Sequence, residues 1–233
     1  ALQSVGSYAF YNCRRLETIT LPQTVTDFGG GALMNCRALH TVVLRAAPNA
    51  PTCLQKLLGE HAGELDVRFE GESPARLLFP AYTEELEDLS PAHIFQRRIH
   101  GAGYGYRQCF DASVLSFRQY DLALTGLLER HDFSVAARVA ARRLAVPYAL
   151  SDAARDAYLD CLRAHGGALL RVCAAAGESA AISFLLSLGV LTAADVDAAC
   201  DAAREKEQTA ALSVLLAATG KTAAKGRAKT FDL

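Results

Sequence analysis

The apolar and polar positions in the first third of the chain repeat every 23 residues. Residues of the same type stand at this offset, so that Gly6 aligns with Gly29 and Cys13 with Cys36. The other aligned pairs are Ala9 and Ala32, Phe10 and Leu33, Asn12 and Asn35, Leu16 and Leu39, Ile19 and Val42, and Leu21 and Leu44. Self-similarity at a fixed period of this length indicates stacked structural repeats, each too small to bury its apolar face alone.

Each repeat contains a short run in which apolar and polar residues alternate. The runs are LETITL, LHTVVL and, in a third and degenerate unit, ELDVRFEG. A period of two predicts a strand whose successive side chains point to opposite faces. With the same offset in all three units, the side chains predicted to point inward are Ile19, Leu21, Val42, Leu44, Leu65 and Val67. Those predicted to point outward, onto one continuous sheet face, are Thr18, Thr20, Thr41, Val43, Arg45, Asp66 and Arg68.

The repeated elements AFxxCxxL and LxxIxLP together give the pattern GxxAFxxCxxLxxIxLPxxV, which resembles the BspA-like leucine-rich repeats. The resemblance covers roughly the first 70 residues. It implies a curved solenoid with parallel strands on its concave side, and a role in binding or adhesion. The chain departs from the pattern at Leu33, which replaces an aromatic residue, and at the glycine-rich turn of Gly30 and Gly31. Because Leu2 and Val5 read as the tail of an earlier unit, we expect further repeats before Ala1.

The pattern changes at about Pro80, after a last expected strand at 77–79, to runs with helical spacing. Residues 81–114 contain acidic and aromatic positions and are predicted to form an adaptor. Beyond residue 115 the sequence predicts helices that end at Gly166 and Gly167, at Gly177, at Gly189 and at Gly220. Thr192 and Asp195 are spaced as a capping pair for one of these helices.

Two helical segments of this region echo one another at an offset of 30, GESAAISFLLSLG and EQTAALSVLLAATG. Paired short helices with small residues at their crossings resemble ankyrin and other alpha-solenoid repeats, although the TPLHxA element of true ankyrin repeats is missing. The predicted fold class is therefore α+β, with a short leucine-rich-repeat solenoid of parallel strands followed by an all-α domain of stacked helix pairs. The expected divisions are 1–80, 81–114, 115–220 and a basic tail at 221–233.

The charge balance argues against nucleic acid and anionic membranes as partners. Lys and Arg number 24 against 25 Asp and Glu, so the chain has no net field of the kind that attracts polyanions. No apolar run reaches the ~18 residues that a membrane-spanning helix needs. An apolar content of 51% is ample for a buried core. These features name no partner; the repeat arrays and the outward sheet face predict that it is another protein.

The seven cysteines are spaced too widely for a disulfide framework or a structural zinc site, and no CxxC occurs. We expect reduced thiols that are mostly buried, with Cys13 and Cys36 stacked in the interior of successive repeats. Free thiols favour the cytoplasm, whereas the resemblance to surface-exposed repeat proteins favours the cell surface or secretion. The compartment stays open, with the cytoplasm slightly favoured and the cell surface or secretion as alternatives that would require a signal peptide before Ala1.

Catalytic chemistry has weak support in the sequence. None of the six histidines is followed by a His or Cys at i+3 or i+4, and neither a metal nor a cofactor site is predicted. His93, His100 and Cys109 could be assembled into a Cys–His arrangement, although a reactive thiol requires a lowered pKa. The glycines of GAGYGY lack the strand and helix context of a phosphate loop and predict a tight irregular turn.

The function predicted from the sequence is a non-enzymatic protein–protein interaction or adhesion module that uses the concave sheet face. One alternative is that the helical region is a structural cap or scaffold, with recognition residing in upstream repeats. A second alternative is an enzyme with a pocket near Cys109.

Overall fold

The computed structural model describes residues 2–89 and 94–227. Internal contacts divide the chain into two compact units. Unit 1 comprises residues 1–132 and 142–151, and unit 2 comprises residues 133–141 and 152–233. Helix α5 (Phe133–Ala145) therefore contributes its last residues to unit 1 and the rest to unit 2. Strands and helices occur together, as expected for an α+β protein.

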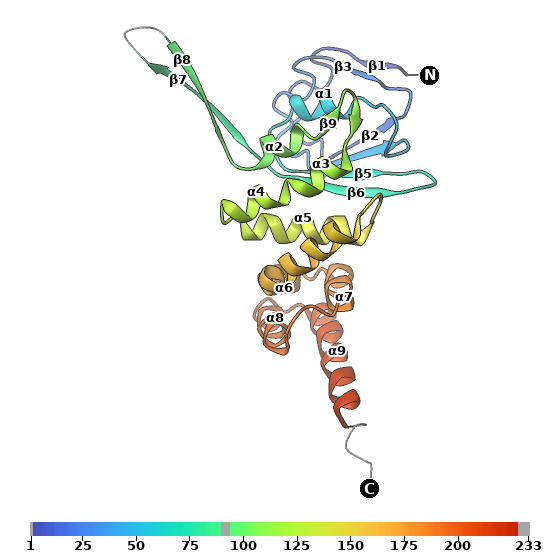
Figure 1. The fold of residues 1–233 in the computed structure, drawn as a ribbon, viewed down its shortest axis with the longest axis vertical. Coiled ribbons are helices and arrows are strands. Elements are labelled where there is room, and N and C mark those ends of the chain that lie inside the picture. Colours follow the sequence, from blue (N-terminus) through green and yellow to red (C-terminus); the bar gives the residue numbers. More distant parts are fainter. Residues whose placement is uncertain (1, 90–93, 228–233) are drawn as a thin grey trace. The chain divides into compact units, whose positions relative to one another are not determined.

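The centre of unit 1 is a four-stranded sheet in the order β2-β4-β5-β6 (Figure 1). Strands β2 (Thr18–Pro22), β4 (Thr41–Arg45) and β5 (Leu65–Phe69) are parallel, and β6 (Ala75–Phe79) is antiparallel to β5. Strand β2 pairs with β4 at the predicted offset of 23, so that Thr18 lies beside Thr41. All six side chains predicted to point inward are buried, which confirms the alternation read from the sequence.

The third repeat departs from the predicted register. Val42 pairs with Val67 and Leu44 with Phe69, so β5 is offset by 25 residues and the predicted pairing of Val42 with Leu65 is wrong. The connection between β4 and β5 contains a short helix, α1 (Leu54–Gly59), which lengthens the third repeat. Because the change is an even number of residues, the predicted inward and outward faces of β5 are preserved.

A second set of backbone contacts joins the first two repeats. Strand β1 (Ser4–Val5) pairs in parallel with β3 (Asp27–Phe28), again at an offset of 23. Asn12 N donates to Met34 O at 2.9 Å. The aligned residues Asn12 and Asn35 have φ values of +63° and +64°, a left-handed conformation that asparagine adopts more readily than most residues. The repeated asparagine thus reflects a repeated backbone shape.

A second left-handed position also recurs at this offset. Gly31 has a φ of +69°, and the aligned Tyr8 has a φ of +59° although its bulky side chain disfavours that region. A Cβ at Gly31 would collide with the Tyr8 ring.

The prediction that Cys13 and Cys36 are both interior is wrong for Cys13, which is exposed. Cys36 is buried as predicted, and its S–H donates to the backbone carbonyl oxygen of Phe10 at 3.1 Å.

The rest of unit 1 consists of short elements and one long hairpin. Strands β7 (Thr83–Leu89) and β8 (Ile94–His100) form an antiparallel ribbon that extends away from the sheet in Figure 1. Helix α2 (Gly103–Arg107) follows where the sequence predicted a turn, so that prediction is wrong. A small hairpin, β9 (Phe110–Asp111) and β10 (Val114–Leu115), leads to helices α3 (Phe117–Leu122) and α4 (Leu124–Glu129).

Unit 2 is helical and contains α6 (Asp152–Ala175), α7 (Ser179–Ser187), α8 (Ala193–Glu205) and α9 (Thr209–Arg227). The expected helix ends near Gly177 and Gly189 are confirmed, since both glycines follow a helix with positive φ. Thr192 and Asp195 form the predicted capping box at the start of α8. Helix α9 continues past the predicted stop at Gly220. None of the helices among the described residues is long and apolar enough to cross a membrane.

The predicted helix end at Gly166 and Gly167 is also wrong, because α6 runs through both residues. A Cβ at Gly166 would lie 2.9 Å from Leu191 Cδ2, and a Cβ at Gly167 would collide with the Asp195 carboxylate. These glycines therefore allow the start of α8 to approach the middle of α6. Their function is tertiary packing, which local sequence signals do not distinguish from helix termination.

Candidate interaction surface

The seven residues predicted to point outward do share one face of the sheet. Parallel pairing places Thr18, Thr41 and Asp66 side by side in one row, and Thr20, Val43 and Arg68 in the next. Arg45 lies two residues beyond Val43 on the same strand and therefore on the same face. The sequence thus predicted correctly which residues the sheet brings together.

The prediction that this face is exposed throughout is wrong in the centre. Thr41 and Val43 are only 6% and 8% exposed. Both belong to β4, which has a neighbouring strand on each side, and Thr41 Oγ1 also lies 2.9 Å from His40 Nδ1. Thr18, Thr20 and Arg45 are exposed as predicted.

Asp66 is the centre of an ion-pair cluster on this face, and therefore has a structural partner that the sequence did not predict. Its carboxylate accepts hydrogen bonds from Arg76 Nε at 2.9 Å and from Arg142 Nε at 3.2 Å, and Arg68 Nε lies 3.4 Å away. Burial acts to raise the pKa of Asp66. The pKa nevertheless lies below its ordinary value, because Arg76 contributes a hydrogen bond and a positive charge and Arg142 and Arg68 contribute further positive charges.

The cluster has more positive than negative charge. The Asp66 side chain is 13% exposed, whereas those of Arg68, Arg76 and Arg142 are 43%, 27% and 33% exposed. One carboxylate therefore fixes three guanidinium groups while leaving part of each in contact with solvent. The name arginine face is used below for the exposed residues Thr18, Thr20 and Arg45 together with the cluster of Asp66, Arg68, Arg76 and Arg142.

Near β6 the sheet is closed by α3. Tyr120 of α3 is fully buried, and its hydroxyl donates to Leu78 O and accepts from Leu78 N at 3.0 Å. Arg143, which is 1% exposed, donates to Asp121 at 2.8 Å next to this contact. The strand edge at β6 is thereby covered.

Arg107 is a buried residue that the sequence reasoning missed. Its guanidinium donates to five backbone carbonyl oxygens at distances of 2.5 to 3.3 Å. These oxygens belong to Leu58, His61, Gly63, Pro80 and Gly103. Burial lowers the pKa of Arg107 to about 10, so the group remains charged at neutral pH. Arg107 connects α2 to the segments around α1 and β6, and no feature of the sequence around it indicates this role.

The proposed Cys–His arrangement is not assembled by the described residues. His93 lies outside them, and His100 Nε2 is 3.5 Å from Glu85 Oε2 on the exposed hairpin. Cys109 is buried, and burial raises the pKa of its thiol to about 11. A thiol with this pKa is protonated at neutral pH and is a poor nucleophile. Over the described part of the chain, no cluster of His, Cys, Asp and Glu could hold a metal ion.

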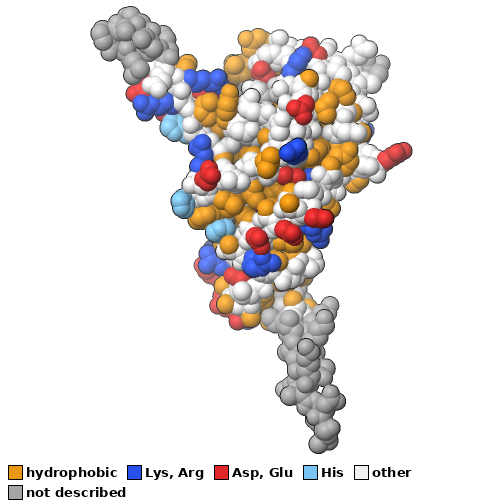
Figure 2. All heavy atoms as spheres, in the orientation of Figure 1, with side chains coloured by type: hydrophobic (Ala, Val, Ile, Leu, Met, Phe, Trp, Pro, Cys, Tyr) orange, Lys and Arg blue, Asp and Glu red, His pale blue; other side chains and the backbone are white. Residues whose placement is uncertain are grey.

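A second exposed surface lies on the turns of the first two repeats. Tyr8, Tyr11 and Met34 are large apolar residues that are each about half exposed or more. Tyr11 and Met34 occupy aligned positions, and the rings of Tyr8 and Tyr11 meet edge to face with centroids 6.1 Å apart. On the side shown in Figure 2, basic and acidic side chains are interspersed and neither sign dominates.

Comparison with known families supports the repeat region alone. Residues 1–50 match the model of the BspA type leucine rich repeat region, which describes six copies. The match is consistent with the repeats read from the sequence, and it does not extend to the helices of unit 2. No curated protein and no solved structure matches the chain.

Proposed function

We propose that the chain is a non-enzymatic protein-interaction module and that the arginine face binds an acidic segment of a partner protein. The observation that carries this proposal is the cluster around Asp66, in which one carboxylate fixes three partly exposed arginines. The likeness of residues 1–50 to leucine-rich repeats supports an interaction role. The shared offset of 23 in two pairs of parallel strands supports the further proposal that the sequence repeats are turns of a solenoid.

The charges and geometry of the face favour an acidic partner. Four arginines, at positions 45, 68, 76 and 142, stand against the carboxylates of Asp66 and of Glu70, which directly follows β5 and lines the same hollow as Arg45. Guanidinium groups bind carboxylates through two parallel hydrogen bonds, and groups already held in place lose less conformational freedom on binding. The exposed hydroxyls of Thr18 and Thr20 add further hydrogen-bonding groups.

The test is binding of a fluorescein-labelled peptide of alternating glutamate and serine to the full chain, followed by fluorescence anisotropy. We expect the double variant Arg45→Ala/Arg68→Ala to bind about tenfold more weakly, since two peripheral ion pairs of ~0.7 kcal/mol each sum to that factor. Added salt should weaken binding to the wild type more than to the variant.

The matched control is Arg15→Ala/Arg37→Ala, which removes two exposed arginines from the repeat turns. This variant has the same net charge as the test variant and should bind like the wild type. Equal losses in both variants would show that net charge alone attracts the peptide, and the assignment to this face would be wrong.

A further inference from the structure

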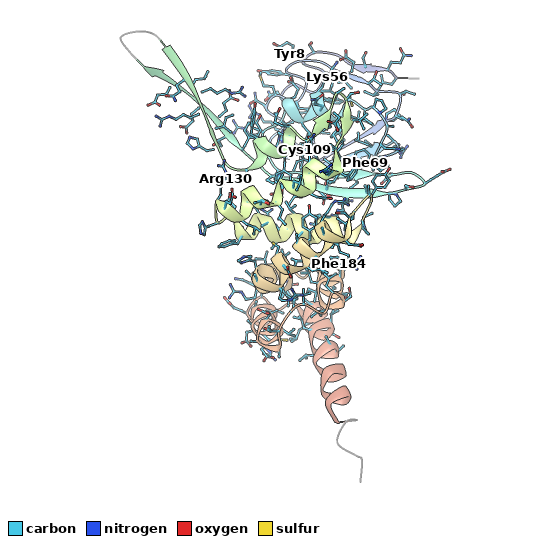
Figure 3. The ribbon with its side chains drawn as sticks, viewed as in Figure 1. Tyr8, Lys56, Phe69, Cys109, Arg130 and Phe184 are labelled. Atoms are coloured by element: carbon cyan, nitrogen blue, oxygen red, sulfur yellow. The ribbon has the colours of Figure 1, made fainter. Side chains whose placement is uncertain are left out.

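Unit 1 contains a pocket of about 480 Å³ that involves neither the arginine face nor the repeat turns. Its walls come from the end of β8 at Ile99, from α2 at Tyr104 and Gly105, from Cys109, and from α4 at Gly126. Arg130 follows α4 at the pocket, and Figure 3 labels both Arg130 and Cys109. The volume lies within the range typical of small-ligand sites.

Two glycines of this wall lack a steric reason to be glycine. A Cβ at Gly105 or at Gly126 would meet no atom within 4 Å, and neither residue has a positive φ. By contrast, a Cβ at Gly103, two residues before Gly105, would collide with Pro80 O. A glycine inside a helix costs roughly 1 kcal/mol relative to alanine. The folded chain alone does not account for this cost, whereas a pocket kept open for a ligand does.

The polar groups at the pocket indicate the chemistry of that ligand. Arg130 and Gln108 are exposed, and within residues 2–89 and 94–227 neither side chain makes a hydrogen bond or an ion pair. The remaining wall is largely apolar or aromatic, with Ile99 and Tyr104 among its residues. A guanidinium and a primary amide beside an apolar wall suit a carboxylate attached to an apolar body.

We propose that this pocket binds a carboxylate ligand, with Arg130 and Gln108 holding the carboxylate and the bare walls at Gly105 and Gly126 receiving its apolar body. The same chemistry is offered by a free aromatic acid and by the C-terminal residue of a peptide. This site does not depend on the interaction proposed for the arginine face, because it uses different residues.

The experiment measures binding to the full chain by isothermal titration calorimetry with four probes. They are phenylacetate, phenylacetamide, the dipeptide acetyl-Ala-Phe with a free carboxylate, and the same dipeptide as its amide. We expect at least one acid to bind about tenfold more tightly than its matched amide, the factor that one charge-assisted hydrogen bond provides. Preference for phenylacetate would indicate a free acid as the natural ligand, and preference for the dipeptide would indicate a peptide terminus.

Two variants test the assignment to this pocket. Gly126→Leu should fill the pocket and abolish binding without lowering the thermal midpoint, because space is available and leucine favours helix. Arg130→Gln should remove the preference for acid over amide, whereas the exposed Arg118→Gln should preserve it. The proposal is wrong if no probe binds the wild type at millimolar concentration, if acid and amide bind equally, or if Gly126→Leu binds like the wild type.

Discussion

Unit 1 and unit 2 are stabilised by different kinds of contact. In unit 1, buried polar side chains such as Arg107 and Tyr120 bond backbone atoms that lie 42 or more residues away in sequence, Arg107 to Leu58 O and Tyr120 to Leu78. In unit 2, bonds such as Arg163 to Asp160 join neighbours on one helix, and close approach at Gly167 brings helices together. Short irregular elements leave carbonyl groups that need outside donors, whereas long helices satisfy their own. We therefore expect the two units to be destabilised by substitutions at different kinds of position.

The largest expected effect is the loss of the Arg107 guanidinium. Arg107→Met leaves five backbone carbonyl oxygens, three buried and two partly buried, without their donor, so we expect the free energy of unfolding of unit 1 to fall by about 3 kcal/mol. Hydrogen exchange followed by mass spectrometry reports the two units separately. Amides of unit 1 should lose protection while those of unit 2 keep it.

Two control substitutions sharpen the Arg107 experiment. Arg107→Lys retains the charge with only three donors in a different geometry, and we expect it to recover part of the loss. Arg163→Met, at an exposed position of unit 2, should change stability by less than ~0.5 kcal/mol. Unchanged protection of unit 1 in Arg107→Met would contradict the anchoring role.

A smaller effect is expected at the contact between α6 and α8. Gly167→Ala normally stabilises a helix by roughly 1 kcal/mol, but here the new methyl group would collide with Asp195, whose carboxylate completes the capping box of α8. We expect unit 2 to be destabilised by about 1 kcal/mol, the typical value of a helix cap, measured by urea denaturation.

The same glycine substitution should change sign when the colliding group is removed. In an Asp195→Ala background, Gly167→Ala should be neutral or stabilising, because only the gain in helix propensity remains. Equal destabilisation in both backgrounds would mean that the contact with Asp195 is not the reason for the glycine.

The smallest expected effect is a difference in acid sensitivity. The pKa of Asp66 is lowered from its ordinary value of 3.8 in the folded state, so its contribution to stability is complete above that value and is lost as pH falls below it. Hydrogen exchange between pH 5 and pH 3 should show a loss of protection in unit 1 that Asp66→Asn reduces. Identical pH profiles for wild type and Asp66→Asn would show that the cluster does not stabilise unit 1.

Local patterns in the sequence were sufficient for much of this fold. Alternation predicted which side chains of β2 and β4 are buried, and the period of 23 predicted their register. The capping box at Thr192 was also predictable, since it depends on two residues three positions apart. In each case the physical cause lies within a few residues or within one repeat.

Other features depend on contacts between distant segments, which the sequence does not display. Alternation assigned Thr41 and Val43 to the outward face but could not reveal that they are buried there. The register of β5 could not be predicted because helix α1 lengthens the connection. Arg107 resembles any other arginine in sequence, and its role appears only when five carbonyl groups converge on it.

The two left-handed positions shared by the first two repeats define a template for protein engineering. At one position both repeats use asparagine, Asn12 and Asn35, while at the other the first repeat has Tyr8 where the second has Gly31. A consensus unit for artificial arrays would therefore specify asparagine at the first position and glycine at the second, where the backbone conformation is unfavourable for tyrosine. Such identical units could be concatenated, and the exposed tyrosine could be reserved for a single unit as an attachment point.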